Sequence, residues 1–102
     1  MSASEIDPVI HAPNRLRICA TLAPLESAEF QFLRDTLDVS DSVLSKHIKQ
    51  LEDAGYAKLR KAKMNGRQHT WVFMTSKGRK AFKSHVEALE EIVAAAQGLS
   101  VD

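Results

Sequence analysis

The chain has 102 residues, with 14 Lys and Arg against 13 Asp and Glu, a formal net charge of +1 at pH 7 and a hydrophobic fraction of 44%. This length predicts one domain over residues 1–102 with a single modest core, in which residues 1–6 form a loose N-terminal end. The start lacks a secretory signal pattern, and the apolar run at residues 92–96 is far shorter than the ~20 residues of a membrane helix, so we expect a cytoplasmic protein.

The N-terminal region predicts two helical segments. Asp7 followed by Pro8 is typical of a helix N-cap and first helical position. From residue 14 to 22 apolar side chains recur at helical spacing, and Pro24 ends this helix. Cys19, the single cysteine, lies on that apolar stripe and should behave as a buried hydrophobe. It excludes an intrachain disulfide and a cysteine-based zinc site within one chain.

Two further helices are predicted on either side of a connection of about three residues, which favours a helix-turn-helix. The first can be capped by Ser27. Its buried stripe consists of Phe30, Leu33 and Leu37. The second, over about residues 41–54, can be capped by Ser40 or Asp41 and is ended by Gly55, which tolerates a left-handed backbone. Its buried face consists of Leu44, Ile48 and Leu51.

A β-hairpin is predicted next, with strands over residues 56–62 and 68–74. Their connection centres on Asn65-Gly66, a pair that tolerates the positive φ angles of hairpin turns. Alternation places two residues inward, Val72 and Met74, and two on the opposite face, Trp71 and Phe73. The second pair either covers part of the last helix or forms an apolar patch for packing on a partner.

The last predicted helix spans residues 76–97 and carries a heptad-like apolar seam. The seam consists of Phe82, Val86, Leu89, Val93 and Ala96. About two heptads are too few for an independent coiled coil, so the seam is buried on its own domain, on a second chain, or on both. We favour burial partly on its own domain and partly on a second chain, which makes the seam an expected dimerisation surface to which both chains contribute.

Charge is sorted along the sequence. Between residues 54 and 86 there are nine basic residues and no Asp or Glu; the nine are Lys58, Arg60, Lys61, Lys63, Arg67, Lys77, Arg79, Lys80 and Lys83. Such a block beside a helix-turn-helix favours a surface that binds a polyanion. The alternative is a solvated face or a guarded sheet edge with no ligand.

Three segments of the chain carry a family resemblance. They are RLRI at residues 15–18, VS at 39–40 followed by LSKHIKQLEDAGY at 44–56, and MTSKGR at 74–79. Together they resemble winged-helix transcription regulators of the MarR and ArsR type, and most of all small stand-alone winged-helix proteins, over about residues 7–97. The resemblance implies an α+β fold: a winged helix-turn-helix with a two-stranded β-hairpin wing and a long C-terminal helix. It also implies a homodimer that binds a roughly palindromic DNA site.

The chain departs from these families in two respects. Residues 21–26 lack the paired cysteines of metal-sensing ArsR proteins, so the usual thiolate metal site is absent. The chain is also shorter than typical MarR proteins, whose additional terminal helices frame a ligand pocket. A small-molecule effector is therefore unsupported.

The DNA-binding residues follow from the predicted elements. The exposed face of the helix over residues 41–54 fits the major groove, and with its cap and margin it offers Ser40, Asp41, Ser42, Ser45, Lys46, Lys49 and Gln50. In the wing, about residues 62–68, Arg67 suits a narrow minor groove, with Lys63 and Asn65 beside it. Phosphate contacts are expected from Lys61, Lys77 and Arg79.

The sequence thus predicts a homodimeric DNA-binding transcription regulator that represses by blocking promoter access. The first alternative is a winged helix that binds another protein, and the second is a regulator with an effector site near the dimer interface. The four histidines share no metal-ligand spacing, and no phosphate loop or nucleophile-base pair is present, so we predict no metal, cofactor or catalytic residue.

Overall fold

The structure is a computed structural model, and it describes residues 5–98. In chain order the elements are α1 (Pro8–His11), α2 (Pro13–Leu22), β1 (Ala28–Glu29), α3 (Phe30–Leu37), α4 (Asp41–Asp53), β2 (Ala57–Met64), β3 (Arg67–Met74) and α5 (Ser76–Gly98).

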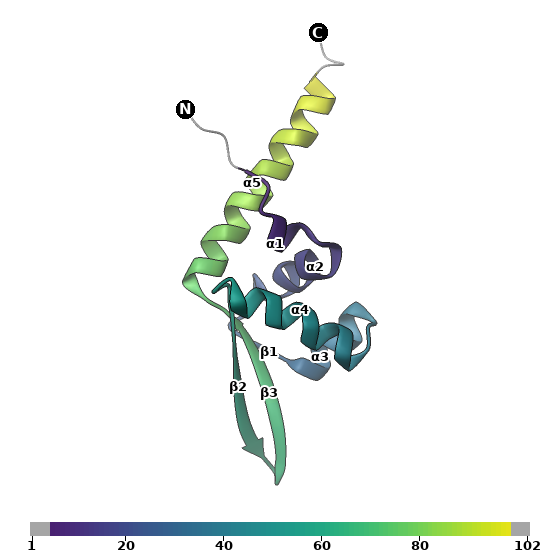
Figure 1. The fold of residues 1–102 in the computed structure, drawn as a ribbon, viewed down its shortest axis with the longest axis vertical. Coiled ribbons are helices and arrows are strands. Elements are labelled where there is room, and N and C mark those ends of the chain that lie inside the picture. Colours follow the sequence, from purple (N-terminus) through teal and green to yellow (C-terminus); the bar gives the residue numbers. More distant parts are fainter. Residues whose placement is uncertain (1–4, 99–102) are drawn as a thin grey trace.

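The molecule is elongated because the β2–β3 hairpin and helix α5 extend from opposite ends of a helical cluster (Figure 1). The strands form an antiparallel sheet in the order β1-β3-β2, and its outer half is the β2–β3 hairpin alone. At the other end α5 leaves the sheet and passes α1 before extending beyond it (Figure 1). Helices α2, α3 and α4 pack together between these two extensions. This arrangement confirms the predicted winged helix with a long C-terminal helix.

The core lies where α2, α3 and α4 meet the base of the sheet, and the predicted inward faces of α4 and β3 are confirmed. Its largest completely or almost completely buried side chains include Ile10, Ile18, Leu22, Leu33, Leu44, Ile48, Leu51 and Val72. Cys19 is buried with them, and burial, assisted by the negative charge of Asp7, raises the pKa of its thiol to about 12. The thiol is therefore protonated at neutral pH, as expected for a small core hydrophobe.

The prediction that Ser27 caps a helix is wrong. Helix α3 begins at Phe30 after Glu29, whose side chain makes no capping bond. Ala28 and Glu29 instead form the short strand β1, which pairs with Val72 and Trp71 of β3. The sheet therefore has three strands where the sequence indicated two. A two-residue strand has no periodicity to detect, and its partner is far away in the sequence.

The predicted cap and stop of α4 and the predicted hairpin turn are confirmed. The Ser40 hydroxyl accepts from the Val43 N–H at 3.2 Å, and Gly55 has a φ of 82° at the end of α4. The hairpin turn is reduced to Asn65 and Gly66, with φ angles of 53° and 77°. Both values fit a two-residue turn with positive φ, so the strands extend two residues further on one side and one on the other than predicted.

The start of α5 is fixed against the turn that follows α4. The backbone N–H of Thr75 donates to the Tyr56 carbonyl at 3.0 Å, and the Thr75 hydroxyl donates to the Gly55 carbonyl at 2.6 Å. The same hydroxyl accepts from the Gly78 N–H at 2.9 Å. A Cβ on Gly78 would lie 2.2 Å from the Tyr56 carbonyl oxygen, so a larger residue here would force the two segments apart.

A polar network ties the N-terminal segment to α5. The backbone N–H of Asp7 donates to Nδ1 of His85 at 3.0 Å, and Nε2 of His85 lies 3.4 Å from Nδ1 of His11. The Asp7 carboxylate caps α1 and accepts from the Tyr56 hydroxyl at 2.6 Å. His85 is completely buried, and because its Nδ1 accepts a hydrogen bond the ring must be neutral.

None of the helices within residues 5–98 is long and apolar enough to span a membrane.

Acidification should destabilise the fold through His85. Burial, and next the repulsion from His11, lower the pKa of His85 from its usual 6.5, so the unfolded chain binds a proton more readily than the folded chain. The stabilisation is complete above the unfolded pKa and is lost as pH falls toward the folded pKa, at up to about 1.4 kcal/mol per pH unit. Urea unfolding across this pH range measures it.

The matched variant is His85→Asn, whose amide oxygen can still accept from the Asp7 N–H but cannot titrate. We expect it to be less stable at neutral pH and to have a flatter pH profile. An unchanged slope in His85→Asn would show that another group is responsible.

Candidate nucleic-acid interface

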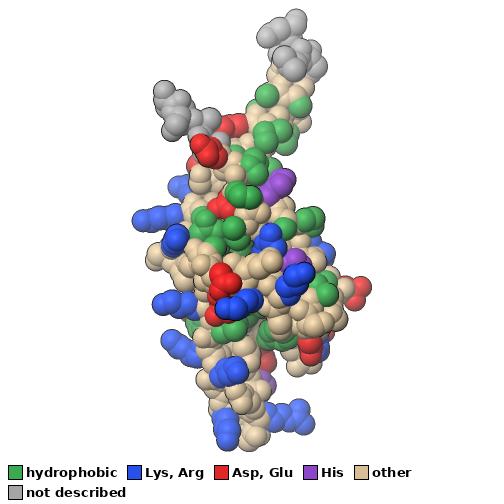
Figure 2. All heavy atoms as spheres, in the orientation of Figure 1, with side chains coloured by type: hydrophobic (Ala, Val, Ile, Leu, Met, Phe, Trp, Pro, Cys, Tyr) green, Lys and Arg blue, Asp and Glu red, His purple; other side chains and the backbone are tan. Residues whose placement is uncertain are grey.

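The outer face of α4 presents small polar and basic side chains to solvent. Ser42, Ser45 and Lys46 are exposed, opposite the buried Leu44 and Ile48. Figure 2 shows Lys and Arg side chains over α4 and along the hairpin on the same face of the molecule. Because the serines are small, the backbone of α4 can approach a partner closely on this face.

Two residues of the predicted set form ion pairs with neighbouring residues. Asp41 accepts from the Arg34 guanidinium at 2.9 Å, which joins the start of α4 to α3. Lys49 pairs with Asp53 one turn later at 2.9 Å, and both side chains are exposed. Surface pairs of this kind are weak, so Lys49 can exchange its carboxylate partner for another anion.

Gln50, at the margin of the face, is held by an arginine that the sequence analysis did not assign to the site. Arg15 of α2 donates to the Gln50 carbonyl oxygen, and its terminal nitrogen lies 3.2 Å from Nδ1 of His47. Its Nε donates to the Val9 carbonyl. The RLRI segment contains Arg15, but no local pattern indicates that its side chain reaches α4.

Alternation along the hairpin decides which basic residues lie on the side of the helices. Ala57 and Val72 are buried beneath the helices, so every second residue of β2 counted from Ala57, together with its partner on β3, lies on that face. Lys61 and Lys63 are two of these residues, and Lys63 is paired with Gln68. Both lysines are exposed. They therefore extend the basic surface of α4 outward along the wing.

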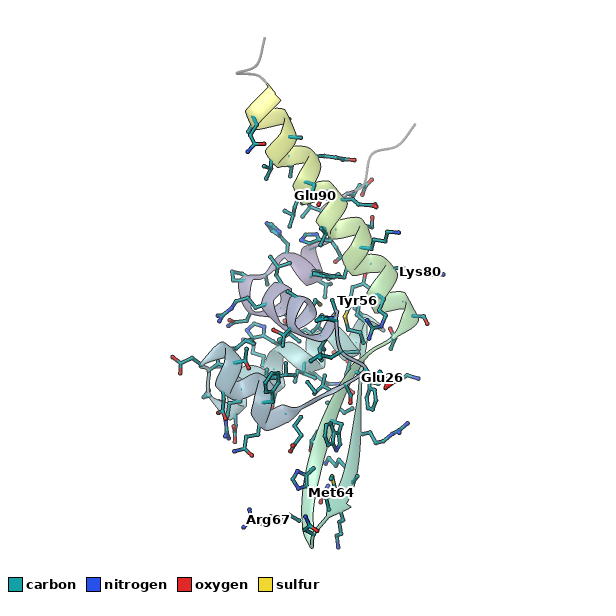
Figure 3. All side chains as sticks on the ribbon, turned by 180° about the vertical axis from the view of Figure 1, so that it is seen from behind. Glu26, Tyr56, Met64, Arg67, Lys80 and Glu90 are labelled. Atoms are coloured by element: carbon teal, nitrogen blue, oxygen red, sulfur yellow. The ribbon has the colours of Figure 1, made fainter. Side chains whose placement is uncertain are left out.

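The tip of the wing carries Asn65 and Arg67. Figure 3 shows Arg67 directed away from the hairpin toward the side on which α3 lies. Arg67 and Arg34 line a hollow of about 280 Å³ between the wing and the start of α3. Asn65 and Arg67 are both exposed, so the tip is accessible to a groove of DNA.

The face of the sheet that points away from the helices is partly covered by side chains of the sheet itself. Trp71 and Phe73 are only partly exposed, and the Arg60 guanidinium lies over the Phe73 ring at 5.1 Å from its centroid. Glu29 of β1 pairs with His69 at 2.6 Å. This face therefore has less free apolar surface than an open patch would offer.

Lys77 and Arg79, predicted to contact phosphate, lie near the junction of β3 and α5. The Lys77 ammonium is 5.8 Å from the centroid of the Tyr56 ring. The Arg79 guanidinium donates to the carbonyl oxygens of Ala23 and Leu25 at 2.8 and 2.7 Å, in the loop after α2. Arg79 thus has a structural partner at the C-terminal end of α2.

The predicted seam on α5 is only partly covered by its own chain. The side of α5 that packs on the domain carries Gly78, His85 and Ala88, whereas Val93 is 53% exposed. Next to the packed side is a hollow of about 450 Å³, lined by Ala23, Met74, Arg79, Phe82, Lys83, Val86, Glu87 and Glu90. The structure therefore leaves an apolar face on α5 that continues past the domain.

The structure brings two of the histidines to partners that the sequence did not indicate. His69 meets Glu29 and His85 meets His11, in each case across more than 30 residues. Within residues 5–98, however, no three His, Cys, Asp or Glu side chains are grouped so that they could hold a metal ion.

Comparison with known proteins agrees with this geometry. Residues 14–93 match the family described as the winged helix DNA-binding domain. The uncharacterized protein MJ0432 of Methanocaldococcus jannaschii is 39% identical over 72 residues, which are 71% of this chain and 78% of that protein.

Solved structures show the same fold. A transcriptional regulator homologue from Pyrococcus horikoshii has a TM-score of 0.82 and 28% identity over 86% of this chain and 87% of its own. A protein described as a MarR-family transcriptional regulator from Enterococcus faecalis has a TM-score of 0.79 over 92% of this chain and 84% of its own. Its identity of 15% supports the fold alone. The resemblance inferred from the sequence is thus confirmed.

Replacing Arg79 should test its structural role. Arg79→Met keeps most of the aliphatic stem but removes both bonds to the loop after α2, so we expect the free energy of unfolding to fall by roughly 1 kcal/mol. Lys80→Met, the exposed neighbour on α5, is the matched control and should change little. Urea denaturation of both variants gives the comparison; equal stabilities would contradict the structural role.

Proposed function

The chain belongs to the winged helix DNA-binding domain family, and we propose that it is a homodimeric transcription regulator that represses by occupying promoter DNA. Helix α4 enters the major groove, and the β2–β3 wing lies along the adjacent minor groove. The relatives with solved structures are described as transcriptional regulators rather than enzymes, and we assign no catalytic residue.

One observation carries the proposal: α4 and the wing carry exposed basic side chains on the same face of the molecule (Figure 2). Lys46 is exposed on the outer face of α4. Lys61 and Lys63 of β2 are exposed on the face of the sheet that the helices cover at its base. An α-helix fits the major groove of B-DNA, and basic side chains on both sides of it can neutralise phosphates and release counterions. The two small serines of α4 favour a close approach to base edges.

The roles of individual residues follow from their chemistry. Ser42 and Ser45 can form hydrogen bonds with base edges or phosphates, and lysines can contact either. Arg67 suits a narrow minor groove because guanidinium loses its hydration more easily than ammonium does. The sequence preference of such a surface depends on DNA shape as well as on base contacts.

The exposed seam of α5 supports a dimer in which the two α5 helices are antiparallel. In the spacing of the seam, Phe82 lies opposite Val93 of the partner subunit, and Val86 lies opposite Leu89 of the partner subunit. The charges of α5 agree with this direction. Its first half carries Lys77, Arg79, Lys80 and Lys83, and its second half carries Glu87, Glu90 and Glu91. Antiparallel helices place these opposite charges beside one another.

Removing the lysines of α4 should weaken DNA binding. For Lys46→Ala plus Lys49→Ala, we expect the affinity to fall roughly tenfold or more and the salt slope to decrease by about 2, because each phosphate contact contributes nearly one released counterion. A titration of fluorescent duplex DNA at several salt concentrations measures both quantities.

The matched control is Lys58→Ala plus Lys80→Ala, which removes the same charge away from the proposed surface. Equal weakening by both double variants would mean that net charge alone determines binding. Absence of DNA binding by the wild-type protein at low salt would favour a protein-binding winged helix.

Disrupting the seam should produce monomers. Val86→Glu places a charge in the proposed interface, and we expect sedimentation velocity to show a shift from dimer to monomer. Lys83→Glu should weaken the dimer, and adding Glu90→Lys should restore it if the helices are antiparallel. Phe32→Ser, which removes an apolar side chain that is 50% exposed on α3, is the control and should leave the dimer intact. A monomeric wild-type protein would overturn the dimer.

A further inference from the structure

Arg15 connects three helices at the edge of the proposed DNA-binding surface. It lies on α2, its Nε donates to the Val9 carbonyl of α1, and its terminal nitrogen donates to the Gln50 side chain of α4. The same nitrogen lies 3.2 Å from Nδ1 of His47. Arg15 is only partly exposed, so its position is restricted by its surroundings as well as by these bonds.

The chemistry of arginine determines how the Gln50 amide is turned. A guanidinium has five N–H donors and no acceptor, so the Gln50 atom that faces it must be the carbonyl oxygen Oε1. The Nε2 amino group is then turned away from Arg15. Gln50 is exposed, and its amino group is the part of the amide free to face a ligand in the groove.

His47 is held in a compatible state. Burial, followed by the positive charges of Arg15 and Lys46, lowers the pKa of His47, so the ring is neutral at pH 7. Its Nδ1 can then accept from Arg15, and the neutral ring carries its hydrogen on Nε2. At neutral pH the ring therefore does not repel Arg15 from its place beside Gln50.

We propose that Arg15 is a positioning residue for base readout: it fixes Gln50 as a hydrogen-bond donor toward DNA and so makes the protein prefer guanine over adenine at one base pair in each half-site. This inference rests on the proposed function, since it requires α4 in the major groove. A free glutamine reads adenine with both amide groups, accepting from N6 and donating to N7. With Oε1 turned to Arg15, Gln50 cannot present both its oxygen and its amino group to the edge of adenine. Guanine offers two acceptors, N7 and O6, to the N–H groups of Gln50 Nε2.

The test is selection from a randomised duplex pool followed by affinity measurements on sites that differ at the Gln50-dependent base pair. The wild-type protein should prefer guanine there by roughly tenfold, the scale of one specific contact. Gln50→Ala should lose this preference and identify the base pair. Arg15→Met, which keeps the aliphatic stem, should accept adenine as well as guanine at the same position while other positions keep their preference.

A second variant leaves Arg15 in place and so avoids any effect of its loss on folding. Gln50→Glu keeps one oxygen on Arg15 and presents the other outward, so its preference should change to cytosine, whose N4 is a donor. Together, adenine acceptance by Arg15→Met and cytosine preference by Gln50→Glu would establish the positioning role.

Other outcomes would overturn the inference. If Arg15→Met binds all sequences more weakly, with a smaller salt slope and unchanged preferences, Arg15 is a phosphate contact. If Gln50→Ala changes no preference, Gln50 does not read a base. Both results leave the proposed DNA-binding function intact, whereas a wild-type protein that selects no sequence and binds no DNA would refute that function and the inference together.

Discussion

The relative placement of the helix, the wing and the long terminal helix depends on one close backbone contact. The turn after α4, at Gly55 and Tyr56, offers two carbonyl oxygens to Thr75, and Gly78 packs without a side chain against the same turn. The strands β2 and β3 begin and end at this point, where Ala57 pairs with Met74. The end of α4, the base of the hairpin and the start of α5 are therefore joined within a few residues.

This junction has a consequence for binding. In the proposed complex α4 and the wing contact two neighbouring grooves, and the geometry of α4 against the wing decides whether both contacts form together. The same junction sets the direction of α5, and with it the separation of the two α4 helices in the proposed dimer. The network of Asp7, Tyr56 and His85 fixes α5 a second time, further along its length. Both connections use short-range hydrogen bonds, which tolerate little displacement.

Most of the fold could be predicted because the residues that start, stop and pattern its elements lie within the elements themselves or next to them. The caps and stops at Ser40 and Gly55, the turn at Asn65-Gly66 and the apolar spacing of α4 are all decided by residues within one or two turns. The strand β1 could not be predicted, because two residues have no period and β1 exists only through its pairing with β3. The environment of Trp71 and Phe73 was also undecided, since alternation gives a face but not what covers it.

The sequence by itself determined the order of the elements other than β1, the sorting of charge and the set of exposed residues on α4 and the wing, because these follow from spacing along the chain. Only the tertiary structure decided which distant groups meet: Arg15 with Gln50, Arg79 with the loop after α2, and His85 with Asp7. Each of these contacts joins residues separated by more than 30 positions, and each is a hydrogen bond that forms within about 3 Å. The spacing of residues does not show which side chains meet when they are more than 30 positions apart. A basic residue that forms hydrogen bonds within its own chain therefore looks the same in the sequence as one that is free to bind DNA.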